Sequence, residues 1–363
     1  QTGFASHLVE DNDIHLRNIT PDATPYRSGL PIDACPESDE DETNPTFLAR
    51  KQKYQSIVGS IGWLAQSTQP DLAPSHSFLS AYCNKLSRSH LNAALYVLHY
   101  IHSTIDYGFS FSSEETAPLH TYMTFPHSSD TEAYNDALPP RTEHHHRLTT
   151  YSDACWGSQI GGAISDGTLL PLFKFRSMSG GIVFRNGGPL GWLGERQDRT
   201  ALSSCEAEIR ATNMGSRITV NMRNMILHLQ SLGYPIDDTD SATTIYNDND
   251  ACVKWCHNLT TKGNRHIEHR ENATREWVAD GSLAVSHVSG KCNSSDIFTK
   301  EMCDGAHFCR LHDSFMSRAS DFLKTIFVSL GTSSAPILDV TAQTARYVSS
   351  ACSALLDVLI AHP

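Results

Sequence analysis

The hexapeptide YSDACW, residues 151–156, places one acid inside a mostly apolar and aromatic stretch with the composition of a β-strand. Burying the carboxylate of Asp153 without a partner would cost several kcal/mol. A chain that keeps an acid at such a position is expected to bring a positive partner to it, either a basic side chain or a metal ion.

The segments after this strand alternate between strand and helix patterns. Two strands, 177–186 and 188–196, follow the first, and a long helical pattern ends at Gly233. Strand patterns return at 243–250 and 282–290, with helical stretches between and after them, the last opening at 294. A meander of three strands followed by alternating helix and strand predicts an α/β domain over residues 149–310, with a mixed five-stranded sheet flanked by helices.

The regions on either side of this domain have other patterns. The first 46 residues are rich in turn formers and acids and predict an extended entry segment. Apolar positions three to four apart predict a mostly helical region over 47–112, broken at TQPDLAPS, and residues 113–148 read as a flexible loop.

Residues 311–363 predict a helical C-terminal extension of two amphipathic helices. The first would place Phe315, Met316, Ala319 and Phe322 on one face. Such faces need cover, either from the chain's own domains or from a second copy, which would make the protein a homo-oligomer.

Composition bounds the class of protein. A chain of 363 residues with a 39% hydrophobic share can build more than one core. The net charge of −12 argues against coating nucleic acid by bulk electrostatics, but not against an enzyme that binds it locally. No apolar run reaches the roughly 18 residues of a membrane span, so no membrane partner is expected. The chain begins at Gln1 with no signal-peptide pattern, which predicts a fragment or processed product that is not secreted.

The ten cysteines form no CxxC pair of the zinc-ribbon or redox type and are expected to be reduced. Cys252, Cys256 and His257 are an alternative metal cluster, although this spacing on a helix more often buries two small residues.

Four acids occupy comparable places in the α/β segments: Asp153 in the first strand, Glu208 one turn into the long helix, Asp248 at the end of the fourth strand, and Asp296 at the start of the last helix. Singly, each reads as a cap or turn residue. If they converge, they would repel one another unless cations lay between them, and oxygen ligands favour two Mg²⁺ or Mn²⁺ ions.

The order of motifs resembles the ribonuclease H domain of copia-type LTR retrotransposon Pol polyproteins. YSDACW resembles the family's YSDADW, IYNDNDA resembles IYCDNQSA, RHIEHR resembles KHIDIR, and SSDIFTK resembles LADILTK. GPLGWLGERQDRTALSSCEAE resembles the stretch that ends in ALSSTEAEY. Upstream, the YQSIVGSIGWLAQ and TQPDLAP segments resemble the thumb or connection region, so the likeness covers about residues 1–310.

The resemblance implies an RNase H-like fold and a two-metal-ion endonuclease that cleaves the RNA strand of an RNA/DNA hybrid to give 5′-phosphate products. The family's catalytic and metal-binding acids carry over to Asp153, Glu208, Asp248 and Asp296, which leaves Glu206 without a catalytic role. No YxDD motif is present, so no polymerase activity is expected. The implied location is intracellular, in the cytoplasm or in retrotransposon particles.

Substrate contacts are predicted at Asn249, Arg196, Arg265, His266 and Asn293, where basic or amide groups flank the acids. Glu271 and Asn272 depart from the family pattern, which has an aromatic residue and a His there. The competing hypothesis is an RNase H-like scaffold that binds nucleic acid or self-assembles with little or no catalysis.

Overall fold

The computed structural model describes residues 2–14, 24–25, 43–84, 86–109, 111, 147–157, 176–234, 236, 241–258, 269–299 and 305–318. Residues Gln1–Arg318 form one compact unit and Ala319–Pro363 a second, which lies outside the described residues. The predicted domain boundary between 148 and 149 stays a prediction.

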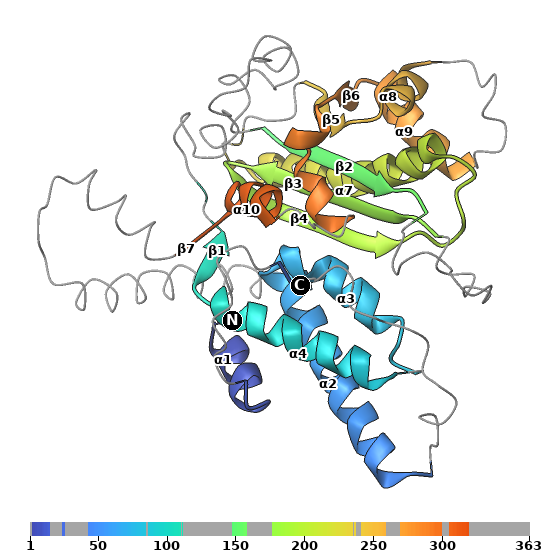
Figure 1. Cartoon of the computed structure of the whole chain (residues 1–363). Coiled ribbons are helices and arrows are strands. Elements are labelled where there is room, and N and C mark those ends of the chain that lie inside the picture. Colours follow the sequence, from blue (N-terminus) through green and yellow to red (C-terminus); the bar gives the residue numbers. More distant parts are fainter. Residues whose placement is uncertain are drawn as a thin grey trace, which may run out of the picture. The chain divides into compact units, whose positions relative to one another are not determined.

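A five-stranded sheet forms the centre of the first unit, in the order β4-β3-β2-β5-β6 (Figure 1). Its strands are β2 (Thr149–Cys155), β3 (Met178–Arg185), β4 (Gly188–Arg196), β5 (Thr243–Asn247) and β6 (Leu283–His287). The first three pair antiparallel, whereas β5 and β6 run parallel to β2 and to each other. This mixed order is that of the RNase H-like fold, and the predicted fold class is confirmed.

Helices on one face of the sheet build its first core layer. The long helix α7 (Ser204–Ser231) packs along β2 and β3, and α8 (Asp250–His257) and α9 (Asn272–Ala279) pack beside β5 and β6. Ile209 of α7 and Ile245 of β5 share a buried cluster with Cys252 and Cys256. These two cysteines are therefore core residues, as their helical spacing favoured, and the described cysteines are all free.

The opposite face of the sheet packs against the N-terminal helices. Because side chains alternate along a strand, Tyr151, Ile182 and Phe184 point away from α7. They belong to one buried cluster with residues of α2 (Pro45–Ser67), α3 (Ala73–Ser80) and α4 (Arg88–Ser103). The helices and the break between α2 and α3, a 3-10 turn η2 (Pro70–Leu72), lie where the sequence predicted them.

The extended entry segment predicted at the N-terminus is wrong for its first residues, which form helix α1 (Thr2–Glu10). Ala5, Leu8 and Val9 follow helical spacing and are buried in the same cluster as α4. A short amphipathic pattern at the chain terminus gave too weak a signal, and the packing against α4 stabilises the helix. Most of the rest of the predicted segment lies outside the described residues.

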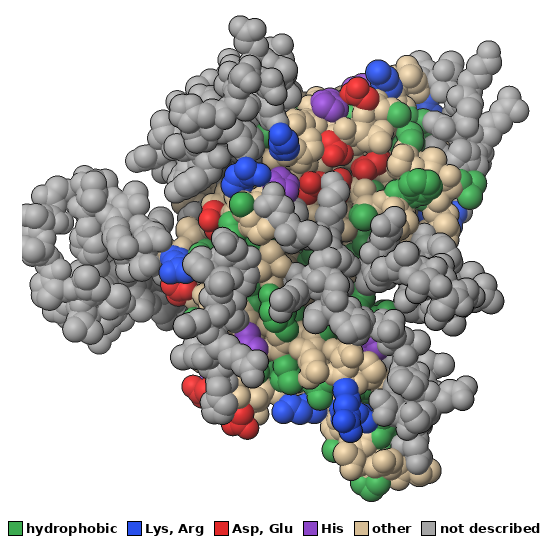
Figure 2. Space-filling view, viewed as in Figure 1, with side chains coloured by type: hydrophobic (Ala, Val, Ile, Leu, Met, Phe, Trp, Pro, Cys, Tyr) green, Lys and Arg blue, Asp and Glu red, His purple; other side chains and the backbone are tan. Residues whose placement is uncertain are grey.

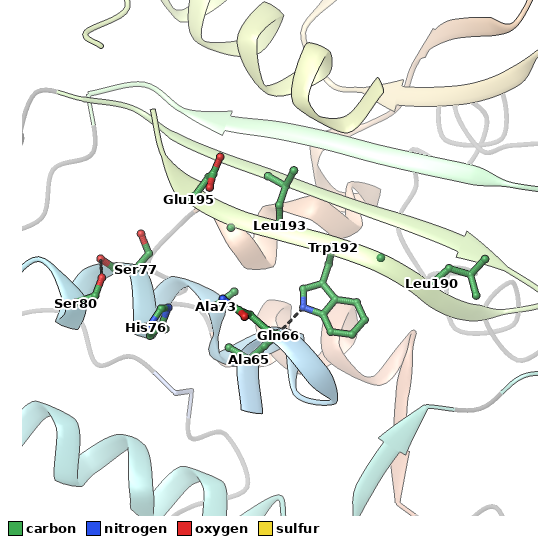
Figure 3. Close-up of a pocket in the computed structure, with 12 residues that line it drawn as sticks. Ala65, Gln66, Ala73, His76, Ser77, Ser80, Leu190, Trp192, Leu193 and Glu195 are labelled. Atoms are coloured by element: carbon green, nitrogen blue, oxygen red, sulfur yellow. Dashed lines mark hydrogen bonds between the residues drawn. The ribbon is translucent and has the colours of Figure 1, made fainter. Parts of the chain in front are cut away.

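Contacts across the edge strand β4 tie the helices to the sheet. The Trp192 indole Nε1 donates a hydrogen bond to the Ala65 carbonyl at 2.6 Å. Beside it lies a pocket of about 540 Å³ that includes His76, Ser80 and Glu195, drawn in Figure 3. The helical segment therefore packs against side chains of the edge strand β4.

Two glycines let the segment after β6 lie directly on the sheet. Gly180 of β3 pairs with Asp153 on one side and Gly194 of β4 on the other. A Cβ at Gly180 would come within 2.6 Å of Thr299 Cγ2 and 2.9 Å of the Ser295 carbonyl. The 3-10 helix η6 (Ser294–Phe298) and Thr299 thus occupy space that a side chain at position 180 of β3 would fill.

Two local predictions near the C-terminal end of this unit differ from the structure. The helix expected to open at 294 is the short η6, and the next α-helix, α10 (Gly305–Asp313), begins later. The helix expected to carry Phe315 and Met316 is instead a strand, β7 (Met316–Arg318), paired with β1 (Tyr107–Phe109). Periodicity cannot reveal this pairing, because the two strands are about two hundred residues apart in sequence. The remainder of the predicted extension lies outside the described residues.

Among the described helices, none combines the length and the apolar character that crossing a membrane requires.

Replacing Gly180 by Ala should destabilise the protein by about 1–3 kcal/mol, since the added methyl group meets η6. Urea unfolding would measure the change. Gly59→Ala is the matched control, because Gly59 lies inside α2 and a methyl group added there would have no atom within 4 Å. That control should stabilise the protein by about 0.5–1 kcal/mol. Equal effects of the two substitutions would contradict this account of Gly180.

Candidate metal centre

Asp153 lies near the end of β2 with 1% of its surface exposed. Its neighbour on β3 is Gly180, and on the parallel side Tyr151 of β2 aligns with Tyr246 of β5. Extending that register by two residues sets Asp153 level with Asp248, and neighbouring strands lie about 4.8 Å apart. The Thr299 hydroxyl donates a hydrogen bond to Asp153 Oδ2.

Glu208 reaches the same place from the second turn of α7. The helix begins after Ser203, whose Oγ accepts a hydrogen bond from the Glu206 N–H at 3.1 Å. Glu206 in turn accepts from the Leu202 N–H at 2.8 Å and pairs with Arg210 at 2.5 Å. Both glutamates are buried, but Glu206 is engaged in capping the helix, whereas Glu208 lies beside Asp153 and Asp248.

Asp248 follows the last residue of β5 and is half-buried. Gly290, in the short 3-10 helix η5 (Gly290–Cys292), leaves room for this carboxylate, because a Cβ there would lie 2.9 Å from Asp248 Oδ2. Asn249 then caps α8 by accepting a hydrogen bond from the Cys252 N–H at 3.0 Å. The chain therefore turns from strand to helix directly around Asp248.

These three acids form one group, in which a carboxylate oxygen from each lies within 4.8 Å of the others. Burial, and then the neighbouring Asp153 carboxylate, raise the pKa of Glu208 to about 10, against the opposing effect of a hydrogen bond from Asn247. Two oxygens bound to one Mg²⁺ lie at most about 4.2 Å apart. A small decrease in the distances between these carboxylate oxygens would therefore let the group hold an ion. Figure 2 shows acidic side chains gathered over the sheet, with basic and histidine side chains at their edge.

Asp296, the fourth predicted acid, is buried in η6 but is not a member of this group. Its Oδ2 lies 3.7 Å from His307 Nε2 on α10. Arg310 donates to His307 Nδ1 at 3.1 Å, so the proton of a neutral His307 imidazole sits on Nε2, towards Asp296. The predicted metal-binding role of Asp296 stays a prediction.

The predicted substrate contacts have different surroundings. Asn249 is half-buried, and Arg196 is half-buried and donates to the Arg176 carbonyl at 3.2 Å. Asn293 is fully buried and donates to the Ser152 carbonyl at 3.0 Å. Arg265 and His266 lie outside the described residues. Substrate contact at all five positions stays a prediction.

Glu271, one of the two departures from the family pattern, has a defined partner. It accepts a hydrogen bond from Arg199 at 3.2 Å and is almost fully buried. Arg199 belongs to the loop before α7, and Arg270 next to Glu271 pairs with Asp198 of the same loop at 2.7 Å. An ion-pair network therefore joins the loop that leads into Glu208 to the start of α9.

Sequence reasoning missed Asn247, which is fully buried beside the acids. Its Nδ2 donates to Glu208 Oε2 at 3.0 Å. A signal was available, since an amide directly before Asp248 replaces the cysteine of the resembled motif IYCDNQSA. An amide at the end of a buried strand must find hydrogen-bond partners, and the neighbouring acids are natural acceptors.

Comparison with curated proteins gives several relatives. The chain is 26% identical over 258 residues to the retrovirus-related Pol polyprotein from transposon RE2 of Arabidopsis thaliana. It is 25% identical over 291 residues to the retrovirus-related Pol polyprotein from transposon TNT 1-94 of Nicotiana tabacum. These alignments cover 71% and 79% of this chain, but the chain spans only 14% and 18% of the length of the two polyproteins.

Two other proteins are similar to part of the chain. The chain is 29% identical over 167 residues to secreted RxLR effector protein 161 of Plasmopara viticola, covering 46% of this chain and 89% of that protein. Among solved structures, RNase H1 from Halobacterium salinarum NRC-1 matches with 15% identity and a TM-score of 0.29, covering 44% of this chain and 98% of that one. A match with so low a TM-score gives no support to the fold assignment, which rests on the sheet topology. No protein-family model matches the chain.

The fold and its acidic group define the class: this is an RNase H-like domain. Its homologues are retrovirus-related Pol polyproteins of plant transposons, which confirms the copia-type resemblance of the motifs. Both alignments are longer than the predicted catalytic domain 149–310, so they extend beyond it.

Adding Mn²⁺ should raise the unfolding temperature of the protein, because an ion relieves the repulsion among Asp153, Glu208 and Asp248. At a concentration of about 100 Kd the expected stabilisation is about 2.7 kcal/mol. Asp153→Asn should remove this response and stabilise the metal-free protein, since one buried charge is gone. Asp280→Asn, in the exposed turn after α9, should leave the response unchanged; a loss of the response there would point to nonspecific binding.

Proposed function

We propose that the chain is a metal-dependent endoribonuclease that cleaves the RNA strand of RNA/DNA hybrids and derives from a retrotransposon Pol polyprotein. The observation that carries the proposal is the convergence of Asp153, Glu208 and Asp248 from β2, α7 and β5 of an RNase H-like sheet. Three ionised acids this close repel one another, so their charged forms are costly to hold together unless cations neutralise them. The relatives' names support a retrotransposon origin but give no activity for this chain.

Two Mg²⁺ or Mn²⁺ ions, when bound, would activate a water and stabilise the charge on the departing oxygen. Asp153, Glu208 and Asp248 would hold the ions, with Asp296 as the fourth acid of the set. The water oxygen forms a bond to phosphorus as the bond from phosphorus to the 3′-oxygen breaks. The 3′-oxygen takes up a proton, which gives a 3′-hydroxyl and a 5′-phosphate.

The proposed substrate contains a group that RNA has and DNA lacks. The 2′-hydroxyl in the minor groove is the group that separates an RNA strand from DNA. With a formal charge of −12, the protein must bind the hybrid through a local surface. An intracellular location, in cytoplasm or retrotransposon particles, follows from this substrate, and self-association through the C-terminal extension stays a prediction.

Trp156 is a substrate-contact candidate that the motif contains but the prediction did not single out. It is 54% exposed, and its indole Nε1 donates to the Ala201 carbonyl at 3.1 Å, so the ring is held against the loop before α7. Leu202 in that loop is 72% exposed. Since Trp156 follows Asp153 by three residues, it lies about 10 Å along the chain from the acids, within reach of neighbouring nucleotides.

The decisive test of the activity is hydrolysis of a labelled RNA/DNA hybrid by the full chain with Mg²⁺ and with EDTA. Asp248→Asn should lower kcat by more than about a thousandfold, a barrier increase of about 4 kcal/mol, because a metal-binding group is lost. Asp250→Asn, two residues away and exposed, should keep wild-type turnover. Binding of the hybrid without any cleavage by the wild-type chain would favour the scaffold hypothesis instead.

Trp156→Ala should weaken hybrid binding by about tenfold, since a single aromatic contact contributes about 1–3 kcal/mol. Fluorescence anisotropy in the Asp153→Asn background would measure binding without cleavage. Trp63→Ala is the control, because Trp63 is similarly exposed, at 59%, but lies on α2. If both substitutions weaken binding equally, Trp156 has no specific role.

A further inference from the structure

The side chain of Asn247 is connected to every part of the acidic group. Its Nδ2 lies within hydrogen-bond distance of Glu208 Oε2 at 3.0 Å, of Thr212 Oγ1 at 3.2 Å, and of the carbonyl and hydroxyl oxygens of Ser152 at 3.2 and 3.3 Å. Glu208 is the acceptor among these that can carry a charge. A hydrogen bond to a carboxylate is the stronger kind, so it selects the orientation of the Glu208 side chain.

The oxygen of the same amide fixes the backbone around Asp248. Asn247 Oδ1 accepts a hydrogen bond from the Asn249 N–H at 2.8 Å, which closes a turn around the residue between them. That residue is Asp248. One planar amide therefore fixes the direction of Glu208 with its nitrogen and the backbone of Asp248 with its oxygen.

Asp153 is tied to this arrangement through the residue before it. The Ser152 carbonyl accepts from Asn247 Nδ2 and also from Asn293 Nδ2, the latter at 3.0 Å. Asn293 caps η6 by accepting from the Ser295 N–H at 3.2 Å. The backbone next to Asp153 is thus held by two buried amides, from the ends of β5 and of η5.

We propose that Asn247 is a positioning residue that presets Glu208, Asp248 and Asp153 to bind divalent ions. The proposal rests on the proposed function only in so far as the acidic group is a metal centre. Second-layer hydrogen bonds of this kind orient metal-binding side chains, and losing one typically weakens metal affinity about 10–100-fold.

The position of Asn247 in the motif supports a specific role in this chain. The resembled pattern IYCDNQSA has a cysteine there, and a thiol can neither donate two hydrogen bonds nor accept one in the geometry of an amide. The amide is therefore a feature of this sequence, placed where the acids meet.

The test uses the full chain with Asn247→Ala and with Asn247→Leu, which keeps the shape of the side chain but loses its hydrogen bonds. Mn²⁺ binding is measured by calorimetry, well below the unfolding temperature of each variant. Both variants should bind Mn²⁺ at least about tenfold more weakly than the wild type. With hybrid at saturating Mn²⁺, kcat should fall while KM stays near the wild-type value.

Asn213→Ala is the matched control. Asn213 is a buried amide on α7 whose Nδ2 donates to the Arg270 carbonyl at 3.1 Å and to Thr274 Oγ1 at 3.2 Å. Its loss should lower the unfolding temperature, as the loss of Asn247 should too, but leave Mn²⁺ affinity unchanged.

Wild-type Mn²⁺ affinity in both Asn247 variants would overturn the inference, as would an equal loss of affinity in Asn213→Ala, which would mark general loosening. Neither result depends on hydrolysis. If the wild-type chain cleaves no hybrid although its Mn²⁺ affinity depends on Asn247, the inference stands and the proposed function is overturned.

Discussion

The mutual repulsion of buried carboxylates is the constraint on which this structure depends. Asp153, Glu208 and Asp248 come from a strand, a helix and a strand end, and each would favour separation from the others in the absence of a cation. The fold opposes this with hydrogen bonds from neutral donors. The Thr299 hydroxyl holds Asp153, and the Asn247 amide holds Glu208. These two donors carry no charge, so they leave the negative charge of the group available to an ion.

The same requirement accounts for features at a distance from the acids. Glycines at 180 and 194 let η6 rest on the sheet, and η6 is followed by Thr299, the donor to Asp153. The N-terminal helices share one hydrophobic cluster with the face of the sheet that η6 also covers. The helical segment and the α/β domain therefore support the acidic group together, as parts of one compact unit.

The relation to Pol polyproteins places the chain among retrotransposon proteins. How its acidic group is held depends on residues particular to this chain. The chain corresponds to less than a fifth of the length of the two polyproteins compared with it. Two of the positions at which it departs from the resembled motifs have a defined partner in the structure. Glu271 pairs with Arg199 of the loop before α7, and Asn247 bonds to Glu208. Both changes lie around the acids rather than among them, so they alter how the group is held.

The sequence by itself determined the strands and helices of the α/β domain, the break between α2 and α3, and the acids to consider. These follow from local periodicity and from motifs, which depend on neighbouring residues. Only the tertiary structure decided what depends on distant partners. The strand β7 exists because β1 pairs with it, helix α1 because α4 buries its apolar side, and η6 lies on the sheet because Gly180 leaves room for it. The grouping of Asp153 with Asp248 likewise comes from the parallel register of β2 and β5, and the role of Asn247 from side chains brought together by folding. A residue pattern states which groups a chain carries, whereas long-range pairing decides which of them meet.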